Sequence, residues 1–306
     1  MKKPNLNTLG GPAGRRCDVK KGGPPVSNQP IVALLYDFDK TLSTQDMQNY
    51  SFIPSLGLAP GDFWKIANDI GRRERMDSVL AYMYAMLREA ERRGRPFTRE
   101  TLNRYGRNIT FFPGVTDWFQ RINRYGELLG VQAEHYIISS GLREIIEGSP
   151  IAGAFKEIFA SEFLYDEEGR PVWPRLAVNF TAKTQFIYRI NKGVLDVSDD
   201  RTLNDSMPDN SKRVPFTNMI YLGDGLSDVP CMKMMRAYGG QAIAVYQAVN
   251  KAGVEQLLRQ RRVDFIYPAD YREGSDLEIT VKNIIRKMAV SQELYEENAG
   301  QLRAIQ

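Results

Sequence analysis

Short apolar runs alternate with amphipathic stretches along most of this chain. Three of the runs are too short for buried helices and are rich in β-branched and aromatic residues, so they predict strands that are buried on both faces of a sheet. These runs cover residues 31–36, 136–138 and 219–222, and two later runs at 242–245 and 265–267 predict further strands. Helical patterns lie between the runs, and strands that alternate with helices predict an α/β fold with a parallel sheet flanked by helices.

The segment from residue 43 to residue 110 differs from the rest because it holds no strand pattern. Three helices are expected in it, near residues 60–70, 76–93 and 98–108. Asp77 or Ser78 can cap the second helix, whose apolar residues recur at helical spacing. We therefore expect a helical module inserted after the first strand.

Turn and helix signals predict the remaining elements. We expect helices at 114–126, after Ser140-Gly141, from Lys183 to Ile190 and at 276–288, a hairpin from 163–165 and 171–173, and a long polar loop at 196–213. As a helix-to-strand connection, this loop should lie at the amino ends of the strands, so we do not interpret its aspartates as a metal site. The expected parts are a disordered extension (1–30), a core (31–42 and 111–290), the helical module (43–110) and a helical tail (291–306).

The positive charge of the chain is concentrated near its N-terminus. Six Lys and Arg residues against one Asp give residues 1–30 a charge of +5, which leaves −1 for the remainder of a chain with a net charge of +4. These residues are also rich in Gly, Pro and Asn and poor in large apolar residues, which predicts a disordered, basic extension. Such a segment can contact nucleic acid or acidic lipid. We expect it to be solvated instead, and we do not expect nucleic acid as a partner.

The counts of cysteine and histidine limit the expected compartment and the kinds of catalytic site that are possible. Only Cys17 and Cys231 occur, so we expect no disulfide framework and a cytoplasmic location. No apolar run approaches the length of about 18 residues that predicts a membrane span, so we expect no membrane contact. The single histidine, His135, argues against multi-histidine zinc sites and His-based triads. Nothing in the sequence indicates an oligomeric state.

Polar residues stand at the ends of the three buried strands. Asp37, Ser139 and Asp224 end these strands, and the carboxyl ends of parallel strands form the ligand-binding edge of a sheet. Asp39 and Asp228 would join them there. Clustered carboxylates repel one another unless a cation neutralises them, and a set of oxygen ligands favours Mg²⁺. We therefore expect Mg²⁺ as the cofactor.

The same residues can perform phosphoryl chemistry. Asp37 can attack phosphorus to form an aspartyl-phosphate, and Asp39 can protonate the departing oxygen and then activate water. Ser139, with Ser140 beside it, and Lys183 supply donors to the phosphate, while Asp228 can hold Lys183 or a metal-bound water. Each short motif alone is common in solvated loops. Their joint placement, with three of them directly after buried strands, favours catalysis.

These residues resemble the motifs of the haloacid dehalogenase superfamily, within it the phosphoserine phosphatase-like branch. The motifs are Asp37-Phe38-Asp39-Lys40-Thr41-Leu42, Ile137-Ile138-Ser139, Lys183 and Gly223-Asp224-Gly225-Leu226-Ser227-Asp228. The resemblance covers about residues 31–270 in the family's order. It implies a Rossmann-like core, an aspartyl-phosphate intermediate and Mg²⁺ held by the Asp37 side chain, the Asp39 carbonyl and the Asp224 side chain. It also implies that the inserted helices form a C1 cap over the site.

Three departures bear on the substrate. Phosphoserine phosphatases have Ser-Gly-Gly where this chain has Ser139-Ser140-Gly141, and usually Asn where it has Ser227. The stretch from Lys183 to Asp224 is also longer than theirs. Asp46 falls near the position of an acidic residue that reads the substrate amine in those enzymes, although a solvated residue is the simpler interpretation. These differences leave phosphatase chemistry intact and leave phosphoserine as one candidate substrate.

The sequence therefore predicts a phosphomonoester hydrolase that acts on a small phosphorylated metabolite. Two alternatives stay open: phosphoryl transfer to an acceptor other than water, and a non-catalytic protein that binds a phosphorylated ligand or nucleic acid. The intact Asp39 argues against the second, since binding alone needs no general acid. Arg72, Arg73 and Arg75 can bind an anionic substrate tail, but we expect them to be a solvated helix end.

Overall fold

The structure is a computed structural model, and it describes residues 29–208 and 211–305 of the 306-residue chain. The predicted basic extension, residues 1–30, lies almost wholly outside the described residues. Within the described ranges, no helix combines the length and the apolar composition that a membrane crossing requires.

The described residues form a seven-stranded sheet in the order β4-β3-β2-β1-β5-β6-β7. The strands are β1 (Ile31–Tyr36), β2 (Gln132–Leu142), β3 (Glu157–Tyr165), β4 (Pro171–Leu176), β5 (Met219–Gly223), β6 (Gln241–Tyr246) and β7 (Phe265–Pro268). All neighbours pair in parallel except β3 and β4, which form the predicted hairpin. The chain runs outward from β1 through β2 to β3 and later returns to β5 on the other side of β1. The sheet therefore has its topological switch beside β1.

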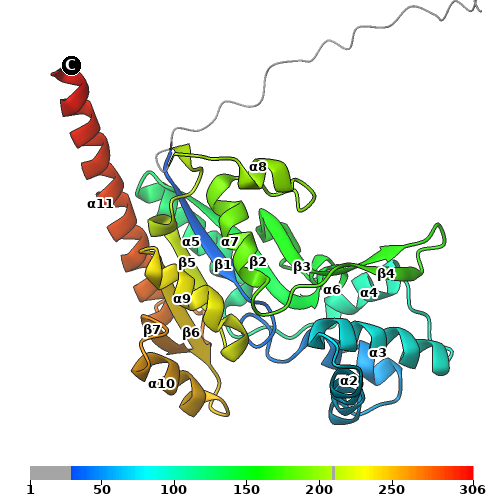
Figure 1. Cartoon of the computed structure of the whole chain (residues 1–306). Coiled ribbons are helices and arrows are strands. Elements are labelled where there is room, and N and C mark those ends of the chain that lie inside the picture. Colours follow the sequence, from blue (N-terminus) through cyan, green and yellow to red (C-terminus); the bar gives the residue numbers. More distant parts are fainter. Residues whose placement is uncertain (1–28, 209–210, 306) are drawn as a thin grey trace, which may run out of the picture.

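Strand β1 is buried on both faces, as its continuous apolar pattern predicts. Val32, Leu34 and Tyr36 belong to one hydrophobic cluster, whereas Ala33 and Leu35 belong to the other. The first cluster includes residues of α5 (Val115–Leu128) and α11 (Asp276–Ala304), and the second includes residues of α7 (Lys183–Lys192), α9 (Val229–Ala237) and α10 (Lys251–Arg259). Two layers of helices thus enclose the sheet (Figure 1).

The inserted segment is helical, as predicted. It contains α1 (Phe52–Ser55), α2 (Pro60–Glu74), α3 (Ser78–Arg92) and α4 (Arg99–Tyr105), with short 3₁₀ turns at Met47–Asn49 and Gly106–Asn108. Asp77 caps α3 by accepting hydrogen bonds from the N–H groups of Val79 and Leu80 at 2.9 and 3.2 Å. Helices α2 and α3 lie beyond the end of the sheet where β1 finishes (Figure 1). The insertion therefore faces the carboxyl ends of the central strands.

Three elements differ from the sequence prediction. Strand β2 is longer than residues 136–138 and changes register between Ser139 and Leu142, after which α6 (Arg143–Glu147) begins. The predicted loop at 196–213 contains a short helix, α8 (Asp200–Asn204), so the expectation of continuous loop was wrong there. Helix α8 does lie at the end of the sheet opposite α2 and α3 (Figure 1). The helix expected at 276–288 continues through the polar tail as one element, α11.

Candidate active site

The predicted residues at the strand ends line one cavity of about 330 Å³. Asp37 follows β1, Ser139 lies at the irregularity of β2, and Asp224 follows β5, which are adjacent strands of the sheet. Asp39 and Lys183 line the same cavity, as does Ser140. The structure therefore brings the predicted strand-end residues together beside the topological switch, where α/β sheets bind ligands.

Lys183 lines the cavity and is held between two carboxylates. It begins α7, is only 1% exposed, and donates hydrogen bonds through Nζ to Asp37 Oδ1 at 2.8 Å and Asp228 Oδ1 at 2.7 Å. Burial alone would lower the pKa of Lys183, but the two carboxylates raise it well above its usual range. The ammonium group therefore stays charged and holds both aspartates in position.

Asp228 is saturated by protein contacts. Its Oδ1 accepts hydrogen bonds from Lys183 and from Tyr221 OH at 2.8 Å, and its Oδ2 accepts one from the N–H of Asp224 at 3.2 Å. A Cβ atom on Gly223 would lie 2.4 Å from Asp228 Oδ2, so only glycine permits this approach. The predicted contact between Asp228 and Lys183 is present, and through Lys183 it helps to hold Asp37 in position.

The carboxylates of this site fit a divalent cation. Asp37, Asp224 and Asp228 each offer an oxygen, and these three oxygens lie within 4.8 Å of one another. Burial raises the pKa of Asp37 to about 6 despite the nearby Lys183, and burial together with Asp228 and Asp37 raises the pKa of Asp224 to about 8. A dication would relieve this repulsion, and three hard oxygen donors suit Mg²⁺. Because Asp228 already accepts hydrogen bonds on both oxygens, Asp37 and Asp224 are the better side-chain ligands.

Asp39 is held beside the cavity by a separate set of contacts. Its Oδ1 accepts a hydrogen bond from the N–H of Met47 at 2.8 Å, and its Oδ2 would lie 3.1 Å from a Cβ atom placed on Gly141. The same Cβ would meet Met47 Cε at 2.1 Å, so a larger residue at position 141 would displace the end of the Met47 side chain. Burial, and then the charges of Asp46 and Asp37, raise the pKa of Asp39 well above its usual range. This carboxyl group can therefore carry a proton.

The Ser139-Ser140 segment carries hydroxyls and is anchored through its backbone. Ser139 Oγ accepts a hydrogen bond from the N–H of Gly141 at 3.0 Å. The carbonyl oxygen of Ser140 accepts from Tyr82 OH at 2.6 Å and from Ser161 Oγ at 3.2 Å, which ties the segment to α3 and β3. Ser140 Oγ is buried and has no hydrogen-bond partner in the described part of the chain. Both serines line the cavity, where their hydroxyls can meet an anion.

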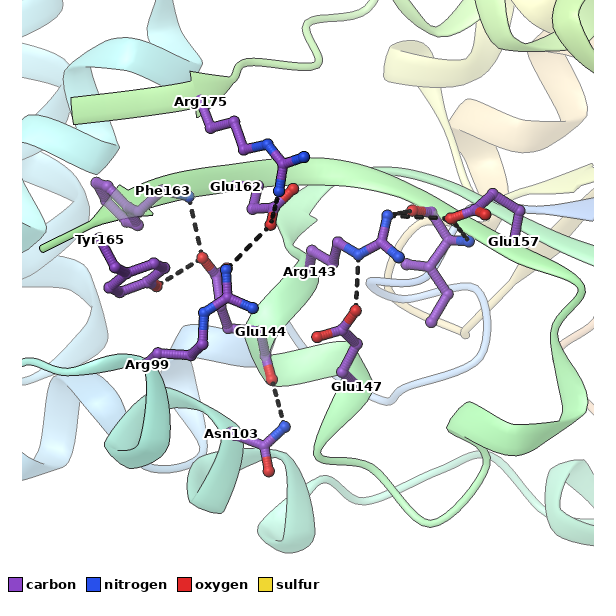
Figure 2. Close-up of polar contacts among 11 residues, drawn as sticks. Arg99, Asn103, Arg143, Glu144, Glu147, Glu157, Glu162, Phe163, Tyr165 and Arg175 are labelled. Carbon is purple, nitrogen blue, oxygen red and sulfur yellow. Dashed lines mark hydrogen bonds and ion pairs between the residues drawn. The ribbon is translucent and has the colours of Figure 1, made fainter. Parts of the chain in front are cut away.

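Behind this segment, a polar network joins α6 to β3, β4 and α4 (Figure 2). Glu144 Oε1 accepts hydrogen bonds from the N–H of Phe163 at 3.0 Å and from Tyr165 OH at 2.5 Å, although Glu144 is only 1% exposed. Beside it, Glu162 binds Arg99 of α4 at 3.3 Å and Arg175 of β4 at 3.0 Å (Figure 2). The network connects the turn after β2 with the last helix of the insertion.

Removal of the Glu144 carboxylate should weaken the fold. We expect Glu144→Ala to lower the free energy of unfolding by about 2 kcal/mol, because the buried N–H of Phe163 and the half-buried hydroxyl of Tyr165 lose their acceptor. Urea unfolding followed by circular dichroism measures this change. Glu147→Ala in the same helix is the matched control, because Glu147 is 33% exposed and its ion pair with Arg143 should contribute less than about 1 kcal/mol. Equal losses in the two variants would contradict a special role for Glu144.

Several residues that line the cavity could not be identified as site residues from the sequence. They are Gln48, Trp64, Asn68, Ser78, Tyr82 and Phe180. Most of them come from the inserted helices, and only their packing against the strand ends reveals them. Asp46 also lines the cavity, but its Oδ1 accepts a hydrogen bond from Lys40 Nζ at 2.7 Å.

The other polar residues considered in the sequence have different surroundings. Arg72 is exposed and pairs with Asp69 at 2.6 Å, outside the cavity lining, as expected for a solvated helix end. The single histidine, His135, is 2% exposed and lies in the core, where it bonds to Tyr36 OH and Asn123 Oδ1. Burial lowers the pKa of His135 to about 3. It is therefore neutral and serves the packing of the fold.

Comparison with known proteins agrees with this architecture. Residues 34–233 match the family model of the haloacid dehalogenase-like hydrolases, which is more than half of the 306-residue chain. A protein of Borreliella burgdorferi that is described only as uncharacterized is 26% identical over 277 residues, which cover 81% of this chain and 94% of that protein.

Solved structures show the same fold at low sequence identity. A substrate-bound phosphoserine phosphatase complex is 14% identical, with a TM-score of 0.51 over 80% of this chain and 97% of that one. A phosphoserine phosphatase in its apo form is 15% identical, with a TM-score of 0.50 over 79% of this chain and 96% of that one. At these identities the likeness establishes the fold, and the predicted Rossmann-like architecture is confirmed.

Proposed function

The chain belongs to the haloacid dehalogenase-like hydrolase family, and from this premise we propose that it is a Mg²⁺-dependent phosphomonoester hydrolase. One observation carries the proposal: Lys183 bridges Asp37 and Asp228 next to Asp224, at the carboxyl ends of adjacent strands. This arrangement combines a fixed nucleophile, a fixed cation and oxygen ligands for a metal. A small phosphorylated metabolite as substrate and a cytoplasmic location, both predicted from the sequence, are part of the same proposal.

The chemistry takes two steps. An Asp37 oxygen attacks phosphorus, the new O–P bond forms, and the bond between phosphorus and the substrate oxygen breaks while Asp39 gives that oxygen a proton. Water then attacks phosphorus, the bond between phosphorus and the Asp37 oxygen breaks to free the carboxylate and inorganic phosphate, and Asp39 accepts the proton that the water loses. Ser139 and Lys183 donate hydrogen bonds to the phosphoryl oxygens throughout. Mg²⁺, held by Asp37, Asp224 and the Asp39 carbonyl, would supply neutralising charge for the phosphoryl group.

The acidic residues favour phosphate esters over haloacids. A halide leaves as a stable anion and needs neither a proton donor nor a metal, whereas an alkoxide leaving group needs a proton from a general acid. Asp39, half-buried beside the cavity and with a raised pKa, suits that role. The crowded carboxylates of Asp37 and Asp224 likewise suit a reaction that brings a metal and a phosphate together. The presence of a general acid also disfavours a protein that only binds phosphorylated ligands, because binding alone needs no proton donor.

Release of inorganic phosphate tests the proposal. The protein should hydrolyse p-nitrophenyl phosphate in the presence of Mg²⁺, and chelation with EDTA should lower the rate by at least about 100-fold, because the site then lacks its counter-charge. Added Mg²⁺ should restore the rate. Release of halide from 2-chloropropionate serves as the competing assay. Equal phosphate release with and without EDTA would contradict the metal requirement, and transfer of phosphate to added glycerol in place of water would favour a phosphotransferase.

A further inference from the structure

The part of the cavity formed by the insertion carries aromatic side chains, and its charged residue is Asp46, which is paired with Lys40. Trp64 comes from α2, Tyr82 from α3, and Phe180 from the stretch before α7. The Trp64 and Tyr82 rings pack edge to face with their centroids 5.9 Å apart. Trp64 donates a hydrogen bond to Asn49 Oδ1 at 3.0 Å and Tyr82 donates one to the Ser140 carbonyl at 2.6 Å, so both rings are fixed. Fixed aromatic surfaces of this kind favour a ring in the ligand.

Cations that could bind a substrate carboxylate are missing from this lining. Among the described residues that line the cavity, Lys40 and Lys183 are the basic ones. Lys183 bonds to Asp37 and Asp228 and serves the phosphoryl group in the proposed reaction, and Lys40 Nζ lies 2.7 Å from Asp46 Oδ1. A substrate carboxylate would therefore enter an acidic cavity without a free partner, which disfavours it strongly.

A substrate amine meets a similar obstacle. Asp46 is the acidic residue expected near the position that reads an amine, and Lys40 already occupies one of its oxygens. An ammonium group would have to displace this lysine or compete with it. An amino-acid leaving group, which carries both charges, therefore finds no free cation for its carboxylate and must compete with Lys40 for Asp46.

Gln48 offers this cavity an amide with an unmet hydrogen bond. Its side chain lines the cavity, is 2% exposed, and has an Oε1 atom without a hydrogen-bond partner in residues 29–208 and 211–305. Buried acceptors are rarely left unpaired, because an unmade hydrogen bond is costly. Gln48 directly follows Met47, whose N–H is bonded to Asp39 at 2.8 Å. The amide is thus held at a set place relative to the residue that would protonate the leaving group.

From these contacts we propose that the site selects phosphate monoesters of neutral alcohols that carry a ring, and that Gln48 Oε1 accepts a hydrogen bond from a hydroxyl or N–H group of that ring. This inference rests on the phosphohydrolase function proposed above. The cavity of about 330 Å³ is at the lower end of the range of about 300–1,000 Å³ for small-molecule sites. It accommodates a phosphoryl group with one ring, and the ring can be a sugar or a heteroaromatic one.

Measurements of turnover and of binding test this inference separately from the phosphohydrolase function on which it rests. Glucose 6-phosphate and pyridoxine 5′-phosphate represent the two kinds of ring, and phosphoserine represents the charged alternative. We expect kcat/KM for at least one ring ester to exceed that for phosphoserine by about 10-fold or more, since buried polar groups discriminate strongly against unmatched substrates. Titration calorimetry with the Asp37→Asn variant and Mg²⁺ should show the same order of affinities.

The possible results bear separately on the hydrolase function and on the preference for ring esters. Absence of phosphate release from every ester, p-nitrophenyl phosphate included, would contradict the hydrolase function, and the calorimetric order would then decide the inference alone. Equal or tighter binding of phosphoserine than of both ring esters would overturn the inference whether or not the protein is a phosphatase. Preference for the sugar or for the heteroaromatic ester identifies which ring the site takes.

Variants of the lining test the proposed recognition. Gln48→Met keeps the size of the side chain and removes the amide, so the ratio of kcat/KM for the preferred ring ester to that for ethyl phosphate should fall by about 10-fold. Gln45→Met is the matched control, because Gln45 is exposed, lies three residues away and should leave this ratio unchanged. An unchanged ratio in Gln48→Met would overturn the role of Gln48.

A second variant covers the case in which Gln48→Met fails to fold. Asn68 lines the cavity from an exposed position of α2, so Asn68→Arg should be tolerated and would add the cation that the lining lacks. We expect it to raise kcat/KM for phosphoserine relative to the ring ester by about 10-fold. An unchanged ratio would show that the cavity does not discriminate against charged substrates and would overturn this part of the proposal.

Discussion

Replacement of Asp37 by asparagine is expected to lower phosphate release by at least about 10³-fold, because the amide cannot act as the attacking nucleophile. Every other contact of the site can stay in place, since an asparagine Oδ1 can still accept the hydrogen bond from Lys183 that Asp37 accepts at 2.8 Å. The measurement is single-turnover release of phosphate from p-nitrophenyl phosphate with saturating Mg²⁺. Asp117→Asn, an exposed position in the first turn of α5, is the matched control and should retain full activity.

Two further readouts make this result specific to the nucleophile. Acid quenching of the wild-type reaction should trap a phosphorylated protein whose label is released by hydroxylamine, as an acyl phosphate is, and the variant should trap none. The free energy of unfolding of the variant should stay within about 2 kcal/mol of wild type, because a neutral amide relieves the burial of a carboxylate while weakening one ion pair. Turnover at more than a tenth of the wild-type rate in a folded variant would remove Asp37 from the mechanism.

The convergence of Asp37, Ser139 and Asp224 could be predicted because strand pairing alone dictates it. Tyr36 is in register with Ile137 on one side and with Leu222 on the other, so the residues that follow these positions share one edge of the sheet. Apolar runs reveal such strands in the sequence, and the polar residue that ends each run is then placed with it. Lys183 required one more inference, namely that its helix begins at the same edge.

The lining supplied by the insertion could not be predicted in this way. Gln48, Trp64 and Tyr82 reach the cavity through the packing of helices whose position over the sheet is not encoded in any periodicity. A buried glutamine next to a motif looks like any polar turn residue in the sequence. Its unpaired Oε1 atom becomes visible only when the neighbours of the amide are known.

Helix α8 was missed for a related reason. Arg189 of α7 is 1% exposed, and its guanidinium donates hydrogen bonds to the carbonyls of Asp196 and Val197 at 2.7 and 3.0 Å and to Asp200 Oδ1 at 2.8 Å. A buried arginine thus organises a stretch whose own composition predicts loop. In α11, by contrast, the buried positions end at Ala289, and the helix continues beyond them because no proline interrupts it and pairs such as Gln292 with Glu296 bond along its surface.

Replacement of Lys183 by methionine should affect both stability and activity. The lysine is 1% exposed and is the cation between Asp37 and Asp228, so its loss leaves two buried carboxylates face to face. Removal of one partner from a buried ion pair typically lowers the free energy of unfolding by about 3–5 kcal/mol. Phosphate release should fall by at least about 100-fold, because the phosphoryl oxygens lose a charged donor. Lys233→Met, an exposed position of α9, is the matched control and should change neither quantity.

The pH dependence of the stability that Lys183→Met loses shows whether charge or packing causes the loss. Burial and the charge of Asp228 raise the pKa of Asp37 and Lys183 lowers it, so without Lys183 this pKa rises further above its ordinary value of about 4 and the folded variant binds a proton more tightly than the unfolded chain does. Stability of the variant in EDTA should therefore be greatest at low pH and fall as the pH rises from about 4 through the neutral range. Adding Asp228→Asn should restore part of the lost stability by removing one of the two charges. A loss that is independent of pH and insensitive to Asp228→Asn would mean that packing of the lysine stem, and not its charge, is what the site requires.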